Sequence, residues 1–113
     1  MADSVETIVA FVTAPSREVA ERIVRDLVER RLVACGNVVG GVRSIYRWQG
    51  AVEEADEVLA ILKARASDLG TIAERVRALH PYEVPEVVAL RIAGGWAPYL
   101  AWVAESTERS GQA

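Results

Sequence analysis

The stretch Val42-Arg-Ser-Ile-Tyr-Arg-Trp-Gln-Gly-Ala51 decides the fold, because it joins two extended segments through a two-residue turn. Before the turn, alternate side chains from Val42 to Trp48 lie on one face of an extended chain. Gln49-Gly50 suits a tight hairpin turn, and the chain then returns to an apolar run over Val58–Leu62. We therefore predict a long β-hairpin in the middle of the chain.

The first strand of this hairpin is expected to begin before the quoted stretch. Leu32–Cys35 reads as its start, Gly36 and Asn37 interrupt it, and Gly40-Gly41 favours a bulge or bend. The outer half, residues 42–57, is longer than one layer of helices covers, and it carries a tyrosine and a tryptophan. An uncovered ribbon with large aromatic side chains indicates a partner.

A strand and a helix precede the hairpin. Val5–Val12 is a short, nearly continuous apolar run, which predicts a buried strand. Ser16 is placed to cap a helix that follows Pro15. The apolar positions recur there at helical spacing, on one face: Val19, Ala20, Ile23, Val24, Leu27 and Val28.

The same order is repeated after the hairpin. Ser67 is expected to cap a second helix that runs to Leu79, and Glu86–Ile92 reads as a fourth strand. A third helix is predicted within Trp96–Glu108. Two such β-α-β units interleave as an α+β, ferredoxin-like sandwich, in which two helices cover one face of a four-stranded antiparallel sheet.

We expect one domain over residues 1–113, with 1–4 and 108–113 frayed. The second face of its sheet would be apolar, so association with other copies is expected.

The net charge of −3 argues against nucleic acid or an anionic membrane as partner. No apolar run is long enough to cross a bilayer, and a single cysteine fits a reducing compartment, so a cytoplasmic location is expected. RNA-binding domains of this topology need stacking aromatics on the central strands, where only Phe11 is found.

The segment His80-Pro-Tyr-Glu-Val-Pro-Glu86 combines the only histidine with two prolines and two carboxylates. The simplest interpretation is that Pro81 ends a helix, Pro85 opens an edge strand and His80 caps the helix near its last carbonyls. Nucleophilic catalysis has one possible set of residues in this sequence, Cys35 and His80 with Glu83 or Glu86. Cys35 lies in an apolar strand, however, and is more simply interpreted as a small buried side chain. We expect no enzymatic turnover. The same thiol, imidazole and carboxylate also suit copper or zinc.

Several motifs in this order resemble the CutA divalent-cation tolerance proteins. They are Thr13-Ala14-Pro15, Leu32-Val33-Ala34-Cys35 with Asn37, Ser44-Ile45-Tyr46 with Trp48 and Gly50, Glu57 to Lys63, His80 to Glu86, and Tyr99-Leu100 with Trp102.

The resemblance implies a compact homotrimer, similar to the PII-type signalling proteins, that binds copper or another divalent metal ion. Cys35 and His80 are its candidate ligands and Glu86 a weaker one. Val12 stands where some relatives have a second cysteine, which lowers the expected affinity for copper. The PII similarity also suggests a competing function, a sensor that binds an organic ligand between subunits, through Lys63, Tyr82, Glu86 and Trp102.

Overall fold

The computed structural model describes residues 5–109. Its elements follow the predicted order and are confirmed as an α+β arrangement. They are β1 (Thr7–Ala14), α1 (Arg17–Glu29), β2 (Cys35–Trp48), β3 (Ala51–Arg65), a 3₁₀ turn (Ala66–Asp68), α2 (Leu69–Leu79), β4 (Val88–Arg91) and α3 (Ala97–Ser106).

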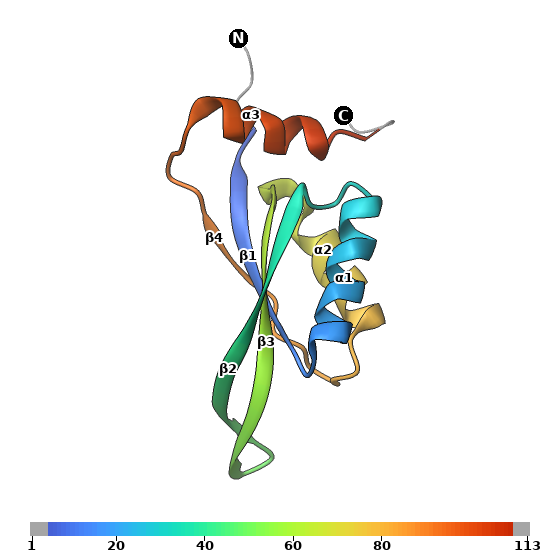
Figure 1. The fold of residues 1–113 in the computed structure, drawn as a ribbon, viewed down its shortest axis with the longest axis vertical. Coiled ribbons are helices and arrows are strands. Elements are labelled where there is room, and N and C mark those ends of the chain that lie inside the picture. Colours follow the sequence, from blue (N-terminus) through green and yellow to red (C-terminus); the bar gives the residue numbers. More distant parts are fainter. Residues whose placement is uncertain (1–4, 110–113) are drawn as a thin grey trace.

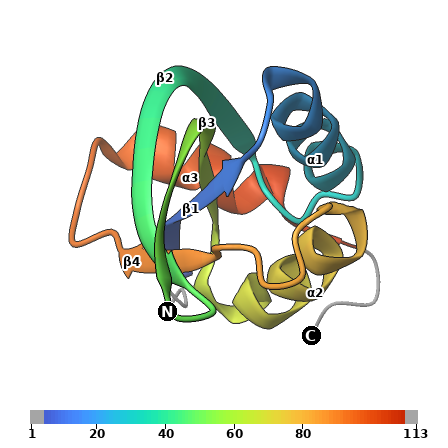
Figure 2. The same ribbon diagram turned by 90° about the horizontal axis from the view of Figure 1, so that it is seen from below.

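One antiparallel sheet organises the molecule, with strands in the order β2-β3-β1-β4. Helices α1 and α2 lie side by side on one face of this sheet (Figures 1 and 2), as the ferredoxin-like prediction requires. Helix α3 crosses the end of the sheet, roughly perpendicular to the strands (Figure 1). None of the helices within residues 5–109 is long and apolar enough to span a membrane.

The core fills the space between the sheet and the two helices. Even-numbered side chains of β1 and β3 point into it, because successive residues of a strand face opposite sides. Helix α1 adds the apolar stripe that its spacing predicted, and Ser16 caps it by accepting a hydrogen bond from the Val19 N–H at 3.2 Å. The buried members of the core are Ile8, Ala10, Val12, Ile23, Val24, Leu27, Leu32, Val33, Ala60, Leu62, Ala64, Ile72 and Val76.

The long hairpin is confirmed, together with its turn and its bulge. Gln49 and Gly50 have φ values of 50° and 85°, the left-handed backbone of a two-residue hairpin turn. The register between β2 and β3 shifts between Val39 and Val42, where the glycine pair lies. The outer half of the hairpin projects beyond the helices (Figure 1).

The predicted interruption at Gly36 and Asn37 is wrong, because β2 runs without a break from Cys35 to Trp48. Gly36 is needed for close packing instead: a Cβ atom there would lie 2.6 Å from Cγ1 of Val24. The glycine therefore lets α1 approach the sheet. Leu32–Cys35, the predicted start of the strand, forms the connection from α1 except for its last residue.

Three other boundaries differ from the prediction. Strand β1 lies two residues later than Val5–Val12, and β4 is shorter than Glu86–Ile92. Ser67 does not cap α2, since it lies inside the 3₁₀ turn, and no side chain caps the helix start. The 3₁₀ turn begins directly after β3 and leaves no room for an ordinary N-cap.

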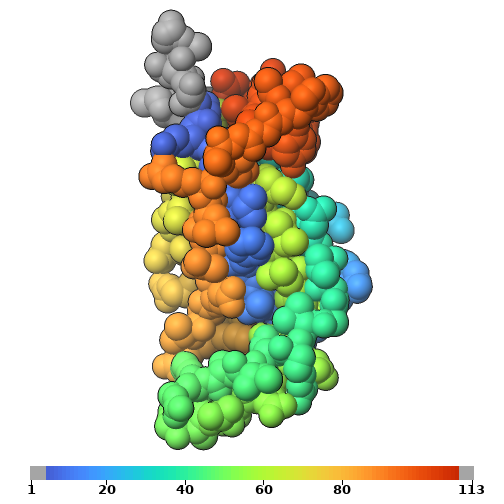
Figure 3. All heavy atoms as spheres, turned by 90° about the vertical axis from the view of Figure 1, so that its left-hand side faces the viewer, coloured from blue at the N-terminus to red at the C-terminus, as the bar shows by residue number. Residues whose placement is uncertain are grey.

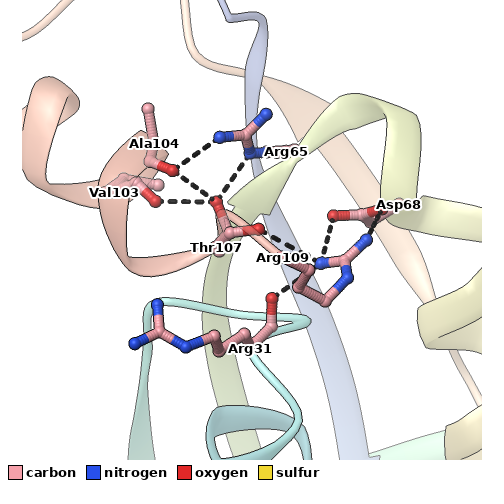
Figure 4. A network of polar contacts seen from close by, with 7 residues as sticks. All are labelled: Arg31, Arg65, Asp68, Val103, Ala104, Thr107 and Arg109. Atoms are coloured by element: carbon pink, nitrogen blue, oxygen red, sulfur yellow. Dashed lines mark hydrogen bonds and ion pairs between the residues drawn. The ribbon is translucent and has the colours of Figure 1, made fainter. Parts of the chain in front are cut away.

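The C-terminal part of the described chain is held by a polar network (Figure 4). Arg65 of β3 donates to Thr107 Oγ1 at 2.9 Å and to the Ala104 carbonyl at 2.7 Å. Arg109 donates to both carboxylate oxygens of Asp68, at 2.7 and 3.1 Å, and to the Arg31 carbonyl at 2.8 Å. Residues 108 and 109, predicted to be frayed, are thus fixed to the fold; the rest of that prediction, 1–4 and 110–113, lies outside the described residues.

Candidate functional site

A groove of about 620 Å³ lies where the hairpin meets the segment that leads into β4. In Figure 3 the green atoms of the hairpin lie directly below the orange atoms of that segment. Strands β1 and β3 contribute Thr13 and Glu57. The remaining lining residues are Ser44, Ile45, Tyr46 and Trp48 of the hairpin, and Tyr82 to Glu86.

His80 fixes the segment 80–86 to the end of β1. Its Nε2 lies 2.7 Å from the Thr13 carbonyl, and its Nδ1 lies 3.1 Å from the backbone N–H of Tyr82. The carbonyl can only accept and the N–H can only donate, so Nε2 carries the proton and Nδ1 accepts. The ring also packs against Tyr82 at a centroid distance of 4.6 Å.

The fold explains why a histidine is needed here. Strand β4 pairs with β1 only as far as Phe11. On the β4 side of β1, the Thr7 carbonyl accepts a hydrogen bond from the Ile92 N–H. Carbonyls alternate in direction along a strand, so the Thr13 carbonyl points to this same side. It lies beyond the end of β4 and has no partner on that strand. His80 supplies the missing donor. His80 is the C-cap of α2, as predicted, but it caps the helix through its backbone N–H, which donates to the Val76 carbonyl. The prediction that its ring lies at the α2 carbonyls is wrong, since the ring reaches across to β1.

Glu57 forms the floor of the groove and is only 7% exposed. Its Oε2 accepts a hydrogen bond of 2.7 Å from the Tyr82 hydroxyl, which ties β3 to the segment 80–86. Burial, together with the hydrogen bond to Glu57 and its charge, raises the pKa of Tyr82 to about 12. Tyr82 therefore stays a neutral donor throughout the physiological range.

The groove is electronegative. Besides Glu57 it contains Glu83 and Glu86, both on exposed positions, while no lysine or arginine lines it. Within residues 5–109 none of the three carboxylates forms an ion pair. Three like charges around one hollow favour a cation.

Cys35 lies far from this groove. It pairs in register with Lys63, whose Nζ bonds to Oδ1 of Asn37. The Cys35 Sγ is 3.5 Å from the Tyr99 hydroxyl of α3. That hydrogen bond, then burial and the charge of the thiolate, raises the pKa of Tyr99 to about 12.

One chain does not bring the predicted metal ligands together. Thr13, which holds His80, pairs with Leu59, whereas Cys35 pairs with Lys63. These positions are four residues apart on β3, about 13 Å at the usual rise of a strand. In the described part of the chain no group of three His, Cys, Asp or Glu side chains could hold a metal ion. The Cys35–His80 pair considered for nucleophilic catalysis is likewise not formed within one chain.

The residues predicted for an organic ligand also divide between two places. Tyr82 and Glu86 line the groove described above. Trp102 lines a second hollow beside the end of α1, and its ring is tilted against that of Tyr99, with the ring centroids 5.7 Å apart. Lys63 stays beside Cys35 at that same end of the sheet.

Glu57 is the groove residue that the sequence analysis did not single out. The signal in the sequence that could have identified it is a carboxylate directly before the apolar run of β3. Its importance depends on the approach of Tyr82, which is 25 residues away in the chain. That approach is set by His80 rather than by any pattern in β3.

A model of the CutA1 divalent ion tolerance protein family matches residues 8–106. The chain belongs to the CutA1 divalent ion tolerance family. It is 52% identical over 99 residues to the divalent-cation tolerance protein CutA of Thermus thermophilus, a match that covers 88% of this chain and 96% of that protein. It is 48% identical over 99 residues to the CutA protein of Mus musculus, covering 88% of this chain but 56% of the mouse protein.

Solved CutA1 structures share the fold. The Thermus thermophilus structure superposes with a TM-score of 0.88 at 51% identity, over 90% of this chain and 99% of that one. CutA1 from Oryza sativa gives a TM-score of 0.90 at 43% identity, over 95% and 98% of the two chains. A rice CutA relative is named chloroplastic and a CutA structure from Archaeoglobus fulgidus is named periplasmic, so the cytoplasmic location stays a prediction.

Proposed function

We propose that this CutA family member binds a divalent cation, copper above all, as a homotrimer, and that this binding underlies cation tolerance. The observation that carries the proposal is the electronegative groove with Glu57, Glu83 and Glu86, in a chain whose relatives are named for divalent-cation tolerance. Carboxylates attract any divalent ion, and divalent copper binds most mixed-ligand sites most tightly.

The open face of the sheet supports the trimer. Odd-numbered side chains of β1 and β3 lie on the face opposite α1 and α2, where Val9, Phe11, Leu59 and Ile61 are only partly buried. The hairpin adds exposed apolar side chains, among them Ile45 and Val52, at 65% and 63% exposure. Both sheet edges, β2 and β4, are free to pair in the described chain. Association through these surfaces buries them.

The ligands then come from more than one subunit. Glu86 is exposed at the groove and is free to coordinate. Cys35 is half-buried and forms only a weak hydrogen bond with the Tyr99 hydroxyl, so its thiol can coordinate an ion that another subunit also binds. His80 acts as a ligand only if Thr13 or Tyr82 releases one ring nitrogen.

Titration with copper and zinc, by calorimetry, tests these ligands one at a time. We expect Glu86→Gln and Cys35→Ser to weaken binding, and His80→Ala to act mainly through stability. Glu54→Gln is the matched control for Glu86→Gln, because Glu54 is also an exposed carboxylate but lies on the hairpin outside the groove, where it pairs with Arg43 at 2.8 Å. Unchanged affinity in the Glu86 and Cys35 variants would remove both residues from the ligand set.

A second function, binding of an organic ligand, is favoured by the size of the groove. A volume of about 620 Å³ is in the range of small-molecule sites and far exceeds that of one metal ion. Of the residues predicted for this role, Tyr82 and Glu86 are already in the groove, and Lys63 and Trp102 would come from another subunit. A thermal-shift screen of nucleotides and metabolites tests this function. If no compound in the screen raises the melting temperature, the result argues against an organic ligand.

A further inference from the structure

The carboxylate of Glu57 keeps one oxygen open to the groove. Its Oε2 accepts from the Tyr82 hydroxyl, while Oε1 has no hydrogen-bond partner among residues 5–109 and is not sealed from solvent. A carboxylate that is 7% exposed and has one neutral donor is stabilised by a positive group that approaches its open oxygen. The groove is the open side from which such a group can come.

Aromatic side chains line the same groove. Tyr46 and Trp48 come from the hairpin and Tyr82 from the facing segment. Tyr46 lies near enough to Tyr82 to contribute to the raised pKa of its hydroxyl, so the two sides of the groove face each other. Ring faces attract cations, and this attraction grows when water is displaced.

The aromatic and apolar lining of the groove does not contribute to metal binding. Within the described residues of one chain the carboxylates form no closely grouped set of donors, so a metal ion there needs ligands from a second subunit. The apolar side chains of Val84 and Pro85 also line the groove and provide no metal ligand. They fit the carbon skeleton of an organic molecule.

From these contacts we propose that the groove binds an organic cation of the alkylammonium class, with its ammonium group at Glu57 Oε1 and its carbon skeleton between Tyr46 and Tyr82. This inference rests on the second candidate function above and names the class of its ligand. Glu83 and Glu86 at the rim add long-range attraction for the positive charge.

The direct test compares two probes of the same shape. Phenethylammonium and neutral 2-phenylethanol differ in the group that would meet Glu57. Binding of each to the intact protein is measured by calorimetry with EDTA present, so that metal binding does not contribute. The proposal expects the ammonium compound to bind at least about tenfold more tightly, the effect of a charge-assisted hydrogen bond.

Variants then locate the probe. Glu57→Gln keeps an acceptor for Tyr82 and removes the charge, so it should weaken phenethylammonium about tenfold or more and leave 2-phenylethanol nearly unchanged. Glu54→Gln, on the same strand but outside the groove, should change neither. Should Glu57→Gln not fold, Tyr46→Leu at a 42% exposed position serves instead, and it should weaken both probes.

The outcomes distinguish the organic-ligand function from the narrower inference that the ligand is an ammonium compound. Equal affinity for both probes keeps an organic ligand site but overturns the ammonium class. No binding of either probe overturns this inference and counts against the organic-ligand function. Phenethylammonium binding that Glu57→Gln and Tyr46→Leu both leave unchanged overturns the site. The metal proposal is tested separately, since EDTA is present throughout.

Discussion

Replacing His80 by alanine should destabilise the protein more than any other single change near the groove. The substitution leaves the Thr13 carbonyl and the Tyr82 N–H without partners and removes a ring that is 7% exposed. Each unsatisfied buried group costs about 1–3 kcal/mol, so we expect a loss of about 2–4 kcal/mol once some water has entered. The segment 80–86 should also become mobile, because the ring is what holds it to β1.

Two further substitutions divide this effect between the ring nitrogens. His80→Asn places an oxygen near Nδ1 and keeps the bond from Tyr82, while His80→Gln places an NH₂ near Nε2 and keeps the bond to Thr13. Each should lose about half as much as His80→Ala, about 1–2 kcal/mol.

The assay is denaturant unfolding followed by circular dichroism. It is run at one fixed subunit concentration, because association would change the apparent stability. EDTA is included, so that loss of a bound metal is not mistaken for loss of these hydrogen bonds. If all three variants lie within about 0.5 kcal/mol of the parent, the structural role given to His80 is refuted.

Three other predictions concern the scaffold and the titration of the groove. Gly36→Ala should destabilise by about 1–3 kcal/mol, because the added methyl would lie 2.6 Å from a Val24 methyl group; calorimetric melting that shows no change would contradict the close packing. Arg75 donates twice to Asp26, at 2.8 and 2.9 Å, and joins α2 to α1, so Arg75→Ala should cost about 1 kcal/mol. The hydrogen bond from Arg75, helped by Arg30, holds the pKa of Asp26 below 3.8, so this stability is present above that pH and is lost on acidification. Unfolding at pH 7 and pH 3 should show the difference between Arg75→Ala and the parent shrinking in acid, and a constant difference would contradict it. For Tyr82 the folded pKa of about 12 exceeds the ordinary value of 10.0, so its contribution is complete below pH 10 and declines as the pH rises to 12. Tyr82→Phe should therefore flatten the loss of stability between pH 10 and 12, and an unchanged slope would count against the buried hydrogen bond to Glu57.

Much of the fold could be predicted from local patterns. The helical spacing of α1, the turn at Gln49-Gly50 and the proline that follows α2 each depend on neighbouring residues only, and all three are confirmed. The repeated order of strand and helix then leaves few arrangements for a sheet.

The errors occurred where a distant element decides the local structure. Gly36 was interpreted as a break, but it lies inside β2 and leaves room for the Val24 side chain of α1. Ser67 had the composition of a cap, but the 3₁₀ turn after β3 uses that position. Sequence spacing could not show either, because both depend on how helices pack against the sheet.

The candidate site was predicted in part. Of the segment 80–86, residues 82–86 line the groove, Tyr82 and Glu86 among them. Glu57 could not be identified from its neighbours, because the Tyr82 hydroxyl reaches it only after His80 has fixed the intervening turn. Cys35 and His80 are distant within one chain, so their joint role in metal binding stays a prediction about an assembly.

Native mass spectrometry of the protein as isolated, without added ion, tests the central claim most directly. It reports the number of subunits and the mass of any bound ion in one spectrum. We predict a species of three 12.3 kDa subunits that carries divalent metal, and loss of that metal from Glu86→Gln but not from Glu54→Gln. A metal-free monomer at micromolar concentration would contradict both the assembly and the proposed cation binding.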